Sequence, residues 1–337
     1  MSHRPSLREL ETLLESWIST PSGRRSFLAS VPLLLTACAA KQKTRYREGD
    51  NQGQTTQMTY DDERALTSEA LPQLRKAYPP LRNSEIQDYI SRIGHNIAKA
   101  NRLEGNPYSY SFTAVSTPMV NAFALPAGTI FVTVPLIAMA DTEAELAGVI
   151  GHEIGHVKAR HAAERMEQQR RDRTKNLWMN LGGAILGGAA GFGLGKALCA
   201  PKDKECLAKA AAIGAAAGAG STLLIQQFSY MANSREDEME ADRIGFRTAV
   251  AAGYSKNHVG DFFEKLQKME ESRQKSGTPF LKSVTDAMST HPPSLERVQQ
   301  MKKMSAETSQ KGGEVSSKDF EKIQKWAKMW TQENSKG

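Results

Sequence analysis

Two histidines four positions apart, with a glutamate directly after the first, constrain the stretch LAGVIGHEIGHVKARH at residues 146–161. In an α-helix, residues i and i+4 lie on one face, so His152 and His156 can direct imidazole nitrogens at one ion. Glu153 lies about 100° further round the helix, beside such an ion. Nitrogen donors suit zinc, and a catalytic zinc takes three protein ligands. The pattern predicts a zinc-binding helix with Glu153 as general base, the alternative being a solvated polar face.

Three glycines in the same stretch favour the functional interpretation. Gly148, Gly151 and Gly155 recur through the predicted helix, and each costs up to about 1 kcal/mol relative to alanine in a helix. A solvated helix face gives no reason for this cost. The glycines therefore indicate close packing against another element.

A third ligand is expected downstream, in the acidic stretch SREDEMEADRIG at residues 234–245. On a helix, Glu238 and Asp242 share one face, whereas Glu236 and Glu240 share another, about 200° away from Glu238. One acid can bind the metal while its i+4 neighbour hydrogen-bonds a ligand histidine. Helical spacing alone leaves both pairs open.

Together the two motifs resemble a known family. His-Glu-Ile-Gly-His followed by Ser234-Arg235-x-x-Glu238-x-x-Ala241-Asp242 is similar to the zinc metallopeptidases of the HtpX and BepA type, which are related to the CAAX prenyl proteases and Oma-type proteases. The resemblance covers about residues 60–300. It implies a mainly helical α+β, zincin-like fold with a small β-sheet and one Zn²⁺ per chain. It also implies Glu238 as the third ligand and Asp242 as a hydrogen-bonding partner behind the ligands.

Two further segments resemble parts of this family. NAFALPAG, beginning at Asn121, is similar to the substrate-binding edge strand, which implies that Asn121, Ala122 and Phe123 contact substrate. His291, in THPPSLERV, matches a histidine near the metal and is expected as a fourth ligand that latches the site or as an oxyanion donor. The alternative is a histidine that only precedes the next helix. His161 is interpreted as a polar residue near the ligands and not as a ligand.

The amino terminus predicts export and lipidation. Paired arginines, Arg24 and Arg25, precede an apolar run too short to span a bilayer, which is typical of a signal peptide over residues 1–37. The arginine pair resembles a twin-arginine export signal, with a general secretory signal as the alternative. Leu35-Thr36-Ala37-Cys38 resembles the bacterial lipobox, which implies cleavage before Cys38 and a lipid anchor; the alternative is an unmodified cysteine in a short core helix. Since Ala39 is not aspartate, resemblance to enteric lipoproteins suggests the outer membrane.

The remaining cysteines lie in a Gly/Ala-rich region predicted as a helical hairpin at residues 177–230. Cys199 and Cys206 flank its charged tip, so in an oxidising compartment we expect a disulfide, with two free thiols as the alternative. The Ala and Gly content drives membrane insertion only weakly, which favours a packed hairpin; whether it enters the membrane is left open.

The rest of the chain is read as a flexible tether at 38–59, a peptidase domain at 60–304, and a polar linker with a C-terminal amphipathic helix at 305–337. Within the domain, alternating residues from 108 to 133 predict short strands, with Pro126-Ala127-Gly128 as a hairpin turn. The net charge of +7 is scattered among acids, so no nucleic-acid surface is expected.

These observations predict a zinc-dependent endopeptidase, lipid-anchored and facing the periplasm of a bacterial cell envelope. By resemblance, its substrates are misfolded or misassembled envelope proteins, so its role is protein quality control. The alternative is a chaperone-like lipoprotein that holds such clients, with latent or rare proteolysis.

Overall fold

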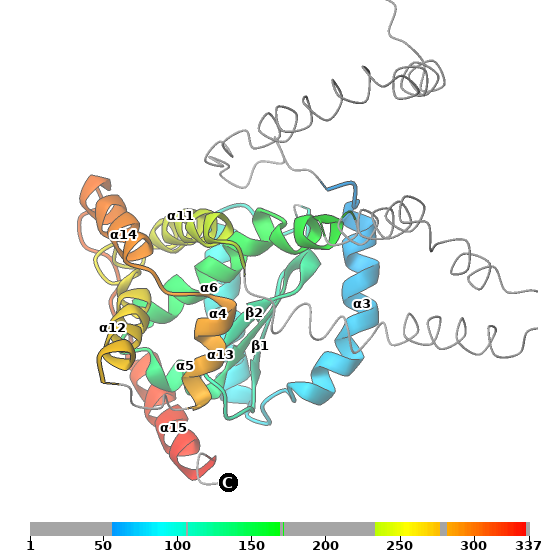
Figure 1. Cartoon of the computed structure of the whole chain (residues 1–337). Coiled ribbons are helices and arrows are strands. Elements are labelled where there is room, and N and C mark those ends of the chain that lie inside the picture. Colours follow the sequence, from blue (N-terminus) through cyan, green and yellow to red (C-terminus); the bar gives the residue numbers. More distant parts are fainter. Residues whose placement is uncertain (1–55, 106, 169–170, 172–232, 277–281, 335–337) are drawn as a thin grey trace, which may run out of the picture. The chain divides into compact units, whose positions relative to one another are not determined.

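The computed structural model describes residues 56–105, 107–168, 171, 233–276 and 282–334 (Figure 1). The predicted signal peptide, Cys38, most of the tether and the Gly/Ala-rich hairpin with Cys199 and Cys206 lie outside the described residues. None of the described helices is both long enough and apolar enough to cross a bilayer.

Two helices precede the sheet. Helix α3 (Tyr60–Ala77) begins at a capping box in which Thr59 and Asp62 satisfy each other's backbone N–H groups. Helix α4 (Ser84–Ala100) begins after Asn83, whose side chain accepts a hydrogen bond from the Ile86 N–H. Its buried face consists of residues at helical spacing, namely Ile86, Tyr89, Ile90, Ile93, Gly94, Ile97 and Ala98.

The sheet has three strands, β1 (Ser111–Val115), β2 (Ala122–Ala124) and β3 (Thr129–Thr133), in the order β1-β3-β2. Strand β2 pairs antiparallel with β3, and the short helix η1 (Pro126–Gly128) connects the two strands. This arrangement confirms the predicted hairpin. Gly128 has a φ of 94°, in the left-handed region that glycine adopts readily. Strand β1 pairs parallel with β3, so β2 forms one edge of the sheet.

Side chains alternate between the two faces of this sheet, and different helices cover each face. Phe131 of β3 joins Phe123 and Val115 in a small cluster with Ala70 and Leu74 of α3. The opposite face belongs to the larger core, which includes residues of α4 and α6 (Glu143–Lys158). Figure 1 shows α3 along one side of the strands and α6 on the other. The sheet thus forms the middle layer between these helices.

Helix α6, which the short helix α5 (Val134–Met139) precedes, packs closely against α11 (Arg235–Ala251). A Cβ added to Gly151 would lie 2.7 Å from the carbonyl oxygen of Gly245, and one added to Gly155 would lie 2.7 Å from that of Ala241. A Cβ at Gly148 would meet the Val259 carbonyl oxygen at 2.0 Å. The close packing predicted from the glycines is confirmed.

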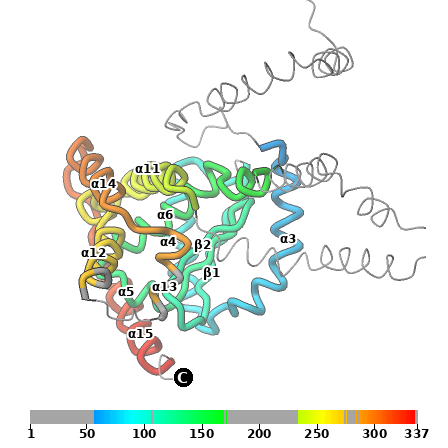
Figure 2. The backbone as a smooth tube through the Cα atoms, in the orientation of Figure 1, coloured from blue at the N-terminus to red at the C-terminus, as the bar shows by residue number. Residues whose placement is uncertain are grey.

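Four helices complete the described chain: α12 (Asp261–Ser276), α13 (Lys282–Thr290), α14 (Leu295–Glu307) and α15 (Lys318–Asn334). Helix α15 contacts α5, and its buried residues Phe320, Ile323 and Ala327 belong to the same core as α4 and α6. Figure 2 follows the backbone to this last helix. Between α13 and α14, residues 291–294 cross towards α6 and carry His291.

Candidate active site

Helix α6 buries the predicted metal-binding motif. Thr142 caps the helix by accepting a hydrogen bond from the Glu145 N–H at 3.1 Å. Within the last two turns of the helix, His152, Glu153 and His156 are 1%, 2% and 8% exposed. Buried polar side chains need hydrogen-bond, ionic or metal partners, so the groups around these three residues indicate their role.

Four side chains from three segments converge at the middle of α6. His152, His156, Glu238 and His291 each offer one ligand atom, and these atoms all lie within 4.8 Å of one another. The Nε2 atoms of His152 and His156 are 3.0 Å apart, and the Glu238 carboxylate lies 3.3 Å from the first and 3.2 Å from the second. This is a metal-binding arrangement, built by α6, α11 and the segment after α13.

His291 lies over this group. Its Nδ1 is 3.2 Å from Nε2 of His152 and 3.1 Å from Oε1 of Glu238. Its Nε2 lies 3.4 Å from Oε1 of Glu153. One imidazole therefore contacts both the ligand set and the neighbouring glutamate, and the next residues, Pro292-Pro293, restrict the backbone that carries it.

Asp242 lies behind the ligands, one turn after Glu238 on α11. Its Oδ1 is 2.8 Å from Nδ1 of His152, the ring nitrogen opposite the one that faces the other ligands. A carboxylate in this position fixes the orientation and tautomer of a ligand histidine.

Arg297, which the sequence analysis did not single out, connects the two carboxylates. Its Nε and Nη2 donate to Asp242 at 2.7 Å each, and Nη1 lies 2.8 Å from Oε2 of Glu238. Burial alone would raise the pKa values of Glu238 and Asp242. The positive charge of Arg297, together with charge and hydrogen-bond contributions from His152 and, for Glu238, the charge of His291, offsets burial and holds both pKa values below their usual range. Both acids are therefore charged, as a metal ligand and its partner must be.

A second polar chain begins at His156. Its Nδ1 lies 2.8 Å from Nδ1 of His161, whose Nε2 lies 3.3 Å from Oε2 of Glu240. If His156 binds a metal through Nε2, its Nδ1–H donates to His161, which in turn donates to Glu240. The described residue Asn233 also donates to Oε1 of Glu238 at 2.6 Å.

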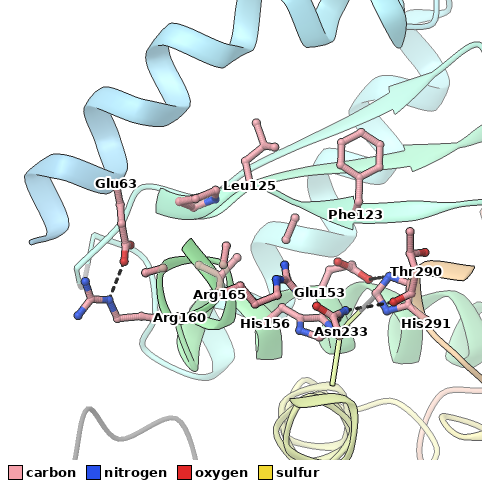
Figure 3. Close-up of a pocket in the computed structure, with 15 residues that line it drawn as sticks. Glu63, Phe123, Leu125, Glu153, His156, Arg160, Arg165, Asn233, Thr290 and His291 are labelled. Atoms are coloured by element: carbon pink, nitrogen blue, oxygen red, sulfur yellow. Dashed lines mark hydrogen bonds and ion pairs between the residues drawn. The ribbon is translucent and has the colours of Figure 1, made fainter. Parts of the chain in front are cut away.

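A pocket opens beside the metal group and extends along β2 (Figure 3). At one end it is lined by Glu153, His156 and His291, and at the other by Leu125 and Pro126. Its remaining lining residues come from α3, β2, α6 and the chain after it, the segment just before α11 and the end of α13, namely Glu63, Phe123, Ala124, Val157, Arg160, Ala162, Ala163, Arg165, Asn233 and Thr290. An edge strand and a metal group therefore border the same pocket.

The family model of peptidase family M48 matches residues 84–305, more than half of the chain and inclusive of every member of the metal group. The chain belongs to peptidase family M48. The match begins at α4 and ends in α14, so it covers the sheet and both packed helices.

Several curated proteins are similar to this M48 chain. The "Beta-barrel assembly-enhancing protease" of Yersinia pestis is 28% identical over 236 residues, which are 70% of this chain and 42% of the relative. The "Metalloprotease LoiP" of Escherichia coli K12 is 29% identical over 226 residues, 67% of this chain and 73% of the relative. The "Mitochondrial metalloendopeptidase OMA1" of Arabidopsis thaliana is 32% identical over 200 residues, 59% of this chain and 32% of the relative. The chain thus spans less than half the length of the first of these.

The donor set fits zinc. His152 and His156 supply nitrogen and Glu238 supplies oxygen, the ligand types that zinc takes in catalytic sites. All three are buried, and each has a polar partner that is not one of the ligands. Asp242 contacts His152, His161 contacts His156, and Arg297 contacts Glu238. These three residues form the zinc-binding site of an M48 peptidase, as predicted.

Of the two acidic faces that helical spacing leaves open, the structure turns Glu238 and Asp242 towards the α6 histidines. Glu240 contacts His161 instead. Asn121 directly precedes the edge strand that contains Ala122 and Phe123, and among the described residues its buried side-chain amide has no hydrogen-bond partner.

Sequence reasoning missed Arg297, Asn233 and Arg165. The signal for Arg297 was its position six residues after His291 in a segment that already resembled the family.

Proposed function

We propose that this chain is a zinc-dependent endopeptidase of the bacterial cell envelope, which hydrolyses peptide bonds in misfolded or misassembled envelope proteins. The observation that carries the proposal is the zinc site with a glutamate beside it, at the edge of a sheet. His152, His156 and Glu238 converge within 4.8 Å, while Glu153 lines the adjoining pocket. The names of the bacterial relatives, an assembly-enhancing protease and a metalloprotease, support the same class.

Glu153 acts as the general base in this proposal. When bound, zinc supplies a Lewis acid that polarises a peptide carbonyl and makes water more acidic. Glu153 is 2% exposed and lines the pocket, within reach of a water between it and the substrate. Its carboxylate accepts the proton of that water as the water attacks, and then transfers the proton to the leaving amine.

Strand β2 binds the substrate backbone. The Thr133 N–H donates to the Asn121 carbonyl and the Leu125 N–H to the Thr129 carbonyl, so residues 121, 123 and 125 face β3. Because backbone groups alternate along a strand, those of Ala122 and Ala124 face the open edge. A substrate strand can pair there, with recognition through the main chain and with weak sequence preference. Asn121 and Phe123, whose backbone groups face β3, then hold the edge strand in place instead of pairing with the substrate.

His291 acts as a latch on the resting site. Its Nδ1 contacts His152 and Glu238, so the imidazole occupies the side from which a fourth ligand would approach. Substrate entry requires it to move aside. We expect His291→Ala to cleave an unfolded protein faster than wild type, at matched zinc content. Slower cleavage at unchanged zinc would assign it to the oxyanion instead, and wild-type rates would exclude both roles.

The anchor belongs to the proposal as well. Cys38 after Leu35-Thr36-Ala37 is the predicted site of lipidation, and this attachment would hold the peptidase domain at the outer membrane, facing the periplasm. Cys38→Ser is expected to lose metabolic lipid labelling and to leave the membrane fraction. Unchanged labelling and fractionation would contradict the lipobox interpretation. The Cys199–Cys206 disulfide stays a prediction, to be checked by non-reducing peptide mass spectrometry.

The catalytic assignment is tested with Glu153→Gln. We expect this variant to keep zinc near one per chain, because Glu153 moves protons and does not bind the metal, while cleavage of an unfolded protein such as casein falls below detection. Metal content is measured on the same preparation as activity. Loss of zinc from the variant, or cleavage at the wild-type rate, would contradict the role of Glu153.

A chaperone-like role is the second candidate, and the position of His291 over the ligands favours it because a latched site cleaves rarely. The Glu153→Gln variant separates the two functions in cells. Peptidase function predicts that the variant fails to protect cells under envelope stress. Protection without cleavage would support the holding role.

A further inference from the structure

Arg165 is a pocket residue that the proposed catalytic steps do not use. It follows α6 in the chain and lines the pocket together with Glu153, His156 and the β2 residues Phe123 and Leu125. In the view of Figure 3, its label lies between the Glu63–Arg160 pair and the zinc-site residues. Its side chain thus belongs to the part of the pocket that a substrate paired with β2 would pass.

The Arg165 guanidinium has no acidic partner among the described residues. Its Nη1 is buried without a hydrogen-bond partner, and no described carboxylate forms an ion pair with it. Asp237, Glu238 and Glu153 act on it only through space. The two other arginines at the site differ, since Arg160 donates to Glu63 at 2.7 Å and Arg297 to Asp242 at 2.7 Å.

Arg165 is partly buried, and a buried N–H group such as its Nη1 is costly unless something completes its hydrogen bonds. Burial lowers the pKa of Arg165, yet a guanidinium remains protonated at every physiological pH. The Glu63 carboxylate, which also lines the pocket, is already held by Arg160 and by the Tyr108 hydroxyl. Arg165 therefore contributes a positive charge to which no described carboxylate of the pocket wall is directly hydrogen-bonded or ion-paired.

We propose that Arg165 is a specificity determinant that binds a carboxylate of the substrate, a few residues from the scissile bond. The inference rests on the proposed peptidase function, because it presumes a peptide aligned along β2. A guanidinium presents a planar fork of N–H groups that matches a carboxylate in a bidentate pair. The carboxylate comes either from an aspartate or glutamate side chain or from the carboxyl terminus of the cleaved chain.

The geometry restricts where such a residue lies. The pocket runs from Glu153 and His291 along β2 to Leu125 and Pro126, and one residue of an extended chain spans about 3.3 Å. A substrate whose backbone pairs with Ala122 and Ala124 carries successive side chains on alternating sides. Only positions on the side that faces the chain after α6 reach Arg165, so we expect a preference at one position and none at its neighbours.

The test measures binding separately from cleavage. Fluorescein-labelled ten-residue peptides with a neutral sequence carry a single glutamate, moved through every position, or glutamine at the same position. Each is made with a free and with an amidated carboxyl terminus, which separates the two sources of the carboxylate. Anisotropy measures their affinity for the full-length, zinc-loaded Glu153→Gln protein, which does not consume them.

We expect one glutamate position, or the free terminus, to bind roughly 10- to 100-fold more tightly than its neutral counterpart, the range of a charge-assisted hydrogen-bond pair. Adding Arg165→Gln should abolish this ratio, and Arg165→Glu should turn it into a preference for lysine at the same position. Arg82→Gln, at an exposed arginine outside the pocket, is the matched control and should keep the ratio.

The outcomes separate this inference from the proposed function. A carboxylate preference that survives Arg165→Gln, or no preference at any position in a protein that binds the peptides, would overturn the role of Arg165. If the Glu153-containing protein cleaves casein while showing no such preference, the peptidase proposal stands and the inference fails. If peptides bind with the preference but are never cleaved by the Glu153-containing protein, the inference stands and the peptidase proposal fails.

Discussion

At the scale of single residues, Arg297 is the buried cation that pairs with both carboxylates of the zinc site. It is 2% exposed and bonded to two buried carboxylates, Asp242 and Glu238. Removing one partner of a buried ionic group leaves the remaining charges without compensation, which costs more than the pair itself contributes. Arg297 therefore compensates the buried charges of Glu238 and Asp242, although it is not itself a metal ligand.

Arg297→Gln is expected to lower the free energy of unfolding by about 3–5 kcal/mol, because Asp242 and Glu238 lose their buried counter-charge. The measurement is urea unfolding of the zinc-free protein, so that altered zinc binding does not contribute. The control is Arg82→Gln, at an exposed arginine, which should change the free energy of unfolding by less than about 0.5 kcal/mol. Equal effects of the two substitutions would contradict the role of Arg297.

His161→Gln is expected to weaken zinc binding roughly 10- to 100-fold, the usual effect of losing a hydrogen-bond partner of a ligand histidine. His161 contacts Nδ1 of His156 at 2.8 Å and so fixes the orientation of that ring. Competition with a chromogenic chelator measures the dissociation constant without reference to activity. His258→Gln, at a half-exposed histidine paired with Asp261, serves as control. An unchanged zinc affinity in the His161 variant would show that His156 needs no such support.

The two histidine ligands could be predicted from the sequence because their spacing is local: His152 and His156 lie one helix turn apart. Glu238 was predicted only through the resemblance to a family motif, since helical spacing left a second pair of acids open. The residues that contact the ligands from behind, such as Arg297, could not be predicted, because their partners are distant in sequence. Arg297 is 55 positions from Asp242, and no periodicity within α14 indicates that its side chain turns towards a carboxylate.

At the scale of elements, the close contact of α6 and α11 depends on glycine at the crossing point. A Cβ on Gly245 would lie 2.6 Å from the backbone nitrogen of His152, which no real contact allows. The missing side chains let two backbones approach, and this approach brings Glu238 of α11 within reach of the α6 histidines.

Gly245→Ala is expected to destabilise the protein by about 1–3 kcal/mol, as overpacking does, and to weaken zinc binding by moving α11 away from α6. Helix propensity alone predicts the opposite sign, a stabilisation of up to about 1 kcal/mol. Urea unfolding therefore distinguishes the two effects by direction. A more stable Gly245→Ala protein with unchanged zinc affinity would show that the helices are less tightly packed than the structure indicates.

Not every element relationship could be predicted. The hairpin of β2 and β3 follows from its turn residues, but the parallel pairing of β1 with β3 depends on contacts that no local pattern encodes. The C-terminal helix was predicted from its amphipathic spacing. That spacing indicates that one face is buried, without indicating that Phe320 and Ile323 enter the same core as the active-site helix.

At the scale of the whole molecule, the metal group joins three segments that are distant in sequence, namely α6, α11 and the segment before α14. A ligand that binds only the folded state stabilises it in proportion to its concentration. Zinc removal with a chelator should lower the melting temperature, and zinc at a thousand times its dissociation constant should restore about 4 kcal/mol, roughly 10 °C.

Differential scanning fluorimetry over a zinc titration measures this shift, with magnesium as control because it prefers oxygen ligands. The His152→Ala, His156→Ala double variant should show no zinc-dependent shift. A melting temperature independent of zinc in the wild-type protein would contradict a metal site that links these segments.

The wide sequence separation of the site also imposes an order on how the enzyme matures. His152 is followed by Glu238 only after 86 further residues and by His291 after 139. A nascent chain that has emerged as far as α6 holds two histidines but lacks the third ligand, and two ligands do not make a catalytic zinc site. A complete set of three zinc ligands therefore exists only once synthesis has passed α11. His291, which lies over the ligands, follows Glu238 by 53 residues. We therefore expect the proposed peptidase activity to be absent from the growing chain until the segment that carries Glu238 has been synthesised.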